Sequence, residues 1–68
     1  MNSSIIGKNI RRIRTEKGLK KWTVSKKLGF HHVNLLYYIE QGRINFVEKD
    51  LEEICKVLDC NKEELTNE

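Results

Sequence analysis

Residues 18–42 read GLKKWTVSKKLGFHHVNLLYYIEQG, and this stretch decides the fold. Glycines stand at both of its ends and near its middle, as Gly18, Gly29 and Gly42. Glycine adopts the left-handed conformation that follows a helix without steric strain, so each of these glycines is predicted to end a helix. Between them, apolar residues recur at helical spacing and do not alternate as in a strand. The stretch is therefore predicted to contain two short helices joined by a tight turn, preceded by a helix that ends at Gly18.

The two helices inside this stretch fit the helix-turn-helix pattern, at about residues 20–41. That pattern requires a small residue where the two helices cross, and Ser25 can fill this position. It also requires apolar anchors on the inner face of both helices. The anchors are Val24, Leu28, Leu36 and Ile39.

Further helices are predicted on both sides of this motif. The apolar residues of the first helix share one face and are Ile6, Ile10 and Ile13. Either Ser3 or Ser4 is expected to be its N-cap. The apolar residues of a fourth helix are Leu51, Ile54, Cys55 and Leu58. A fifth, short helix is expected after Asn61, which forms a capping-box pattern with Glu64 and precedes Leu65.

The predicted fold class is therefore all-α, a compact domain of five crossed helices that spans residues 1–68 as a single domain. A chain of this length has little room for the deep pocket of an enzyme. It also carries no oriented catalytic set and no glycine-rich phosphate loop. We therefore expect neither an enzyme nor a protein with a small-molecule substrate.

The histidines and cysteines indicate no metal site. His31 and His32 could be combined with Cys55 and Cys60, but adjacent histidines project apart and the spacing of zinc ligands is missing. No metal and no cofactor are therefore expected. Cys55 lies on the apolar face of the fourth helix and is interpreted as a small buried hydrophobic residue.

The sequence gives no sign of a membrane protein. No run approaches the ~18 consecutive apolar residues that indicate a membrane-spanning helix. The first six residues are too short and too polar for a secretory signal. A soluble cytoplasmic protein without a membrane partner is expected.

Charge is strongly polarised along the chain. Residues 1–45 carry ten basic and two acidic side chains, a net charge of +8, whereas residues 46–68 carry three basic and eight acidic side chains, a net charge of −5. One pole should attract a polyanion such as nucleic acid, and the other should repel it. Two merely solvated helix faces are the competing interpretation of this charge pattern.

Five short stretches of the chain form an ordered set. They are IGKNIRRIR at 6–14, EKGL at 16–19, KLG at 27–29, IEQGR at 39–43 and the apolar pattern of 51–65. The set resembles the phage-repressor helix-turn-helix family, which is the lambda-repressor-like, XRE/Cro type. The resemblance extends from Ile6 to Leu65. It implies a five-helix lambda-repressor-like domain whose third helix enters the major groove of double-stranded DNA.

The resemblance also implies roles for individual residues. Arg14 and Glu40 match a structural ion pair between the first and third helices. Lys21 matches a position that touches a phosphate. The exposed face of the recognition helix corresponds to Val33, Asn34, Tyr37 and Tyr38. Gln41 and Arg43 match positions that contact the DNA backbone.

The chemistry of the side chains supports these assignments. The amide of Asn34 can pair with adenine in the major groove. Lysines along the second helix can neutralise phosphates, and a histidine in the turn could gain positive charge beside them as the pH falls. Tyr37 and Tyr38 are adjacent and point about 100° apart on a helix, so at most one can face the core. The predicted DNA-binding residues are Lys20, Lys21, Lys26, His32, Val33, Asn34, Tyr37, Tyr38, Gln41 and Arg43.

Two features depart from the family pattern. Lys20 and Lys21 stand where the family usually has Ser-Gln, which removes a good N-cap and replaces an amide with a charge. The segment from Leu28 to Glu40 is one residue longer than usual, around residues 30–32.

Trp22 occupies an early position of the second helix, where a structural or packing role is favoured over a contact with DNA or with a second subunit.

The leading interpretation is a sequence-specific transcriptional regulator, most simply a repressor that binds an operator as a homodimer. The acidic last two helices are the best candidate for the dimer contact. The alternative is a protein-interaction module, antitoxin-like or anti-repressor-like, that keeps the fold but binds protein through the aromatic residues Trp22, Phe30, Tyr37 and Tyr38. A third possibility is an architectural DNA binder without sequence preference.

Overall fold

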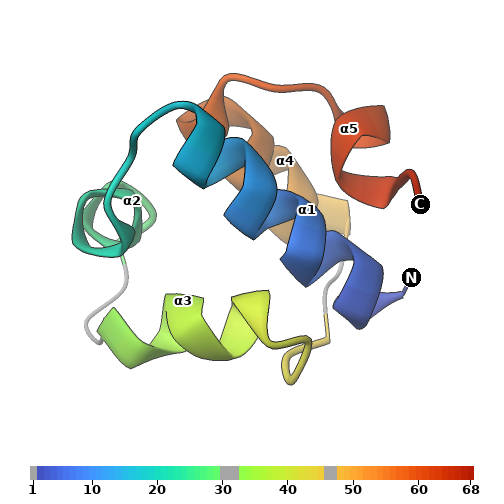
Figure 1. Ribbon diagram of the computed structural model, residues 1–68, viewed down its shortest axis with the longest axis horizontal. Coiled ribbons are helices and arrows are strands. Elements are labelled where there is room, and N and C mark those ends of the chain that lie inside the picture. The colour runs from blue at the N-terminus through green and yellow to red at the C-terminus, as the bar shows by residue number, and fades with distance from the viewer. Residues whose placement is uncertain (1, 30–32, 46–47) are drawn as a thin grey trace.

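The computed structural model describes residues 2–29, 33–45 and 48–68 and contains five helices in this part of the chain. The helices are α1 (Ser3–Glu16), α2 (Lys21–Lys27), α3 (Val33–Glu40), α4 (Glu48–Leu58) and α5 (Lys62–Thr66). In Figure 1, α1 crosses the middle of the molecule in front of α4, with α3 along one side and α2 and α5 near opposite ends. The predicted all-α arrangement of five crossed helices is confirmed.

A single apolar core holds these helices together. Its fully buried members come from all five helices and are Ile6, Ile10, Ile13, Val24, Leu36, Ile39, Leu51, Ile54, Leu58 and Leu65. Fully burying an aliphatic side chain of this size contributes about 1.5–3 kcal/mol. Each predicted anchor of the helix-turn-helix lies in or against this core, because Leu28 is half-buried and the other three are buried.

The three glycines predicted to end helices do so. Gly18, Gly29 and Gly42 have φ angles of 69°, 77° and 78°, which lie in the left-handed region. The capping box that begins α5 is also present, since the Asn61 side chain accepts from the Glu64 N–H while the Glu64 side chain accepts from the Asn61 N–H. The sequence pattern therefore located these helix ends well.

The N-cap of α1 is Asn2, and the expectation of Ser3 or Ser4 is wrong. The side-chain oxygen of Asn2 accepts from the backbone N–H groups of Ser4 and Ile5, at 3.1 and 3.2 Å. Asparagine and serine are about equally good N-caps, so the sequence alone did not distinguish neighbouring candidates. The helix begins one residue earlier than a serine cap would allow.

The first half of α1 packs very closely against the end of α3. Gly7 lies in α1, and a Cβ added there would stand 2.3 Å from the carbonyl oxygen of Ile39 and 2.9 Å from that of Glu40. A Cβ added at Gly42 would stand 2.9 Å from the Cα of Ser4. Glycine at these two positions allows the backbones of α1 and α3 to approach, and this contact fixes the C-terminal end of α3.

No helix among residues 2–29, 33–45 and 48–68 combines the length and apolar character needed to cross a membrane.

Candidate nucleic-acid interface

A buried ion pair anchors the C-terminal end of α3 to α1. The Nε of Arg14 lies 2.7 Å from Oε2 of Glu40, and its Nη2 lies 3.2 Å from Oε1, so the pair is bidentate. The Nη1 of Arg14 donates to the carbonyl oxygen of Leu19 at 2.9 Å. Both charged residues are buried, at 7% and 6% exposure. Arg14 therefore joins α1, the segment before α2 and the end of α3, in the pairing that the family resemblance implies.

The helix α3 has two distinct faces. Leu36, Ile39 and Glu40 are buried against the rest of the domain. Asn34, Tyr37 and Tyr38 are exposed, and their i, i+3, i+4 spacing places them on one side of the helix. Because the two tyrosine residues are 42% and 39% exposed, neither faces the core. The exposed side of α3 therefore presents one amide and two phenol rings to solvent.

Cations lie over both tyrosine rings. The Nζ of Lys21, at the start of α2, is 5.2 Å from the centroid of the Tyr37 ring. The Tyr37 and Tyr38 rings meet edge to face, with centroids 5.7 Å apart. The guanidinium of Arg43, just beyond α3, is 5.7 Å from the centroid of the Tyr38 ring. We call Lys21, Tyr37, Tyr38 and Arg43 the aromatic-cation row.

The aromatic-cation row joins residues that the sequence identifies only individually. Lys21 and Arg43 were each predicted to contact the DNA backbone, and the tyrosines were predicted to lie on the exposed face of α3. Helical periodicity gives the face on which a side chain lies, but it does not show which residue of another segment reaches that face. The alternation of cations and aromatic residues along the sequence was the only signal for a contact between them.

The lysines of α2 extend the basic surface. Lys20 precedes α2 as its N-cap residue, and its side chain makes no capping hydrogen bond, as the loss of the usual serine predicts. The Nζ of Lys26 lies 5.0 Å from the centroid of the Trp22 ring. Trp22 is 59% exposed, so it does not pack into the core. Lys26 covers part of its ring. Ser25 is buried on the inner side of α2, as the helix crossing requires.

Three further residues predicted to bind DNA are His32, Val33 and Gln41. Gln41 is exposed in the turn after α3, beside Arg43. Val33 begins α3, but its side chain lies outside the described part of the structure. His32 lies outside the described residues. The structure thus brings together residues from the start of α2, the exposed side of α3 and the turn that follows it.

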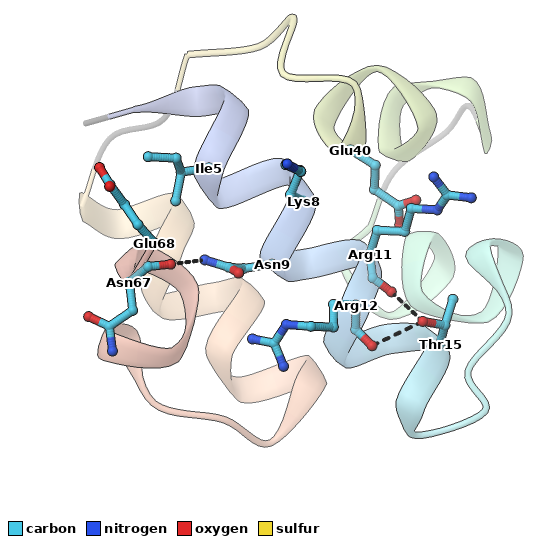
Figure 2. Close-up of a pocket in the computed structure, with 9 residues that line it drawn as sticks. All are labelled: Ile5, Lys8, Asn9, Arg11, Arg12, Thr15, Glu40, Asn67 and Glu68. Atoms are coloured by element: carbon cyan, nitrogen blue, oxygen red, sulfur yellow. Dashed lines mark hydrogen bonds between the residues drawn. The ribbon is translucent and has the colours of Figure 1, made fainter.

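A second surface lies along α1 and shares no residue with the aromatic-cation row. It is a hollow of about 660 Å³ bounded by α1 and the C-terminal tail, with Glu40 at its edge (Figure 2). The Asn9 amide donates to the carbonyl oxygens of Leu65 and Asn67, both at 2.7 Å, and so ties the tail to α1. The basic residues that line it are Lys8, Arg11 and Arg12. Arg12 is paired with Glu16 on the surface of α1.

The two cysteines lie where α4 ends. The backbone N–H of Cys60 donates to the carbonyl oxygen of Cys55 at 3.0 Å, around Asp59, whose φ is 54°. Both cysteines are half-buried against the core, so Cys55 is less buried than expected. Burial raises the pKa of the Cys60 thiol to about 11, with a further contribution from Cys55. Within the described ranges, no group of three or more His, Cys, Asp or Glu residues is arranged to hold a metal ion.

These features define a class: the five helices, with α2 and α3 as the helix-turn-helix, form the lambda-repressor-like fold. A solved structure with a similar fold is that of the restriction-modification controller protein C.AhdI from Aeromonas hydrophila. The two chains superpose with a TM-score of 0.80 and are 26% identical, over 91% of this chain and 92% of that one. This similarity confirms the resemblance seen in the sequence. No protein-family model and no curated protein matches the chain.

Proposed function

We propose that the protein is a sequence-specific regulator of transcription that binds double-stranded DNA, with residues 1–68 acting as one DNA-binding domain. The observation that carries the proposal is the exposed side of α3, where Tyr37 and Tyr38 lie between Lys21 and Arg43 and Asn34 is exposed on the same side. The similar structure of C.AhdI, a restriction-modification controller protein, supports a regulatory role. The major groove is about 12 Å wide and admits a helix such as α3.

In this proposal the two sets of residues have separate tasks. The exposed side of α3 meets the base edges, whereas Lys20, Lys21 and Arg43 meet phosphates and fix the register of the helix in the groove. The buried Arg14–Glu40 pair holds α3 in a fixed orientation while it does so. Repression follows because the bound protein occupies a promoter.

We further propose that the protein binds as a homodimer through the acidic helices α4 and α5. Dimers of helix-turn-helix proteins place their recognition helices about 34–36 Å apart, one turn of DNA. The longest extent of the domain is 26 Å, so two copies fit side by side on one face of the duplex. The acidic helices, kept away from the phosphates, are free to supply the contact.

The test is the salt dependence of binding, measured by fluorescence anisotropy with duplexes selected from a random library. Lys21→Ala should weaken binding to every sequence and reduce the salt slope by about 0.9, the value for one lost phosphate contact. Lys8→Ala removes the same charge from an exposed position of α1, outside both the proposed DNA contact and the proposed dimer contact, and is the matched control, with an unchanged slope. The proposal is wrong if no duplex is bound more tightly than competitor DNA at any salt concentration.

One observation favours a second candidate function, a protein-interaction module. The exposed large hydrophobic residues among the described parts of the chain are Trp22, Tyr37 and Tyr38, and they lie on the same two helices. Burying aromatic rings against another protein would depend little on salt, whereas DNA binding weakens steeply with salt. The salt series therefore separates the two functions. Equal affinity for all duplexes would instead indicate an architectural DNA binder.

A further inference from the structure

The exposed side of α3 lacks the residues that most often read guanine. Arginine and lysine bind guanine through two hydrogen bonds, and this is the most common specific contact in the major groove. The sequence from Leu28 to Gly42 contains neither residue type. The nearest cations, Lys21 and Arg43, lie over the tyrosine rings at the two ends of the row.

The residues that α3 does expose suit an A·T base pair. Asn34 carries an amide that can pair with adenine through two hydrogen bonds, in which its N–H donates to N7 and its oxygen accepts from the N6 amino group. The Asn34 side chain is exposed, so its amide is open to solvent. Thymine differs from the other bases by its 5-methyl group, which apolar and aromatic side chains contact. Tyr37 and Tyr38 offer ring carbon atoms next to Asn34 for this purpose.

The spacing of the three residues sets the distance between the bases. The helical rise of about 1.5 Å per residue places Tyr37 about 4.5 Å and Tyr38 about 6 Å from Asn34 along the axis. Successive bases of one DNA strand are about 3.4 Å apart. When α3 lies along the groove, the tyrosines therefore stand one to two base pairs from the base that Asn34 contacts.

The tyrosine rings are held in place before DNA arrives. Lys21 covers one face of the Tyr37 ring, Arg43 covers one face of the Tyr38 ring, and each ring packs on the other edge to face. Tyr37 and Tyr38 nevertheless remain 42% and 39% exposed. Because the rings are already ordered, placing them against a thymine methyl group costs less conformational entropy.

We propose that α3 reads an A·T-rich half-site, in which the Asn34 amide pairs with adenine and the rings of Tyr37 and Tyr38 contact the methyl groups of thymines one to two base pairs away. This inference rests on the proposed function.

The test uses base analogues in the sequence that a random duplex library selects. Replacing the adenine by 7-deazaadenine removes the N7 acceptor, and the wild-type protein should lose affinity about three- to tenfold. Replacing thymine by deoxyuridine removes only the methyl group, which should lower affinity about fourfold for each contacted base. The adenine that is most sensitive to 7-deazaadenine and the thymine that is most sensitive to deoxyuridine should lie one to two base pairs apart.

Variants then assign each effect to a residue. Asn34→Ala should bind the adenine and 7-deazaadenine duplexes equally, and Tyr37→Ala or Tyr38→Ala should bind thymine and deoxyuridine duplexes equally. Asn67→Ala is the matched control for the asparagine, because Asn67 is exposed on the C-terminal tail, and it should keep the wild-type response to both analogues. All of these side chains are exposed, and thermal melts verify that each variant is folded.

The outcomes are distinct. A selected sequence with G·C pairs opposite residues 34–38, or a wild-type protein that ignores both analogues, overturns the inference while the proposed function stands. Selection of no sequence at all overturns the proposed function and the inference with it. Loss of each analogue effect in its own variant alone supports the inference.

Discussion

Replacing Gly7 by alanine should destabilise the protein, although the same change in most helix interiors is stabilising. Gly7 lies within α1, where alanine is favoured over glycine by about 0.8–1 kcal/mol. At this position, however, the added Cβ would stand 2.3 Å from the carbonyl oxygen of Ile39. The ordinary contact distance for a Cβ is 3.4–4 Å, so α1 and α3 would have to move apart by roughly 1 Å.

The sign of the net effect follows from comparing the two contributions. Overpacking a core contact costs about 1–3 kcal/mol, and the upper part of this range applies because backbone atoms cannot rotate away as a side chain can. Subtracting the gain in helix propensity leaves a net loss of about 2 kcal/mol. In a domain of this size, that loss lowers the melting temperature by roughly 8–16 °C.

The assay is thermal unfolding followed by circular dichroism, with Thr15→Ala as the control. Thr15 is an exposed residue of α1, so alanine there should gain helix propensity without meeting α3. The melting temperature should fall for Gly7→Ala and stay level or rise for Thr15→Ala. If both variants are stabilised alike, the close approach of α1 and α3 at Gly7 is not a feature of the protein.

Three further predictions concern other parts of the fold. Glu40→Ala should lower the free energy of unfolding by about 3–5 kcal/mol, since it leaves the Arg14 charge buried without its partner, and a urea titration that matches the wild type would exclude this. Asn61→Ala should cost about 1 kcal/mol through loss of the capping box of α5, seen as a lower melting temperature; an unchanged value would mean that the cap is not needed. The pKa of Cys60 is raised by burial from 9.0 to about 11, so the stability that this thiol contributes is complete below pH 9 and is lost as the pH rises from 9 to 11. Cys60→Ser should therefore flatten the dependence of urea stability on pH in that window, and identical curves for the two proteins would contradict the assignment.

The sequence was sufficient to predict the fold because the decisive signals are local. Glycine after an apolar helix, as at Gly18 and Gly42, and the pairing of Asn61 with Glu64 each depend on a few neighbouring residues. The N-cap of α1 shows the limit of such signals. Asn2 and the two following serines are all good caps, so the exact first residue depends on small energy differences between adjacent positions.

Features that depend on packing between distant segments were not predictable in the same way. The role of Gly7 arises only because Ile39 and Glu40 pass close to α1, and nothing near Gly7 in the sequence signals this. The tyrosines illustrate the same limit at the candidate site. Their spacing allowed at most one to face the core, but it did not show that Lys21 and Arg43, from outside α3, would lie over the two rings.

The division of α3 into an anchoring face and an exposed face makes the domain a suitable scaffold for protein engineering. Leu36, Ile39 and Glu40 hold the helix, and none of them lies on the outward side. Positions 34, 37 and 38 can therefore be randomised together without disturbing the core or the contact with Gly7. A library built at these three positions would change the surface that the helix presents while the rest of the molecule keeps its shape.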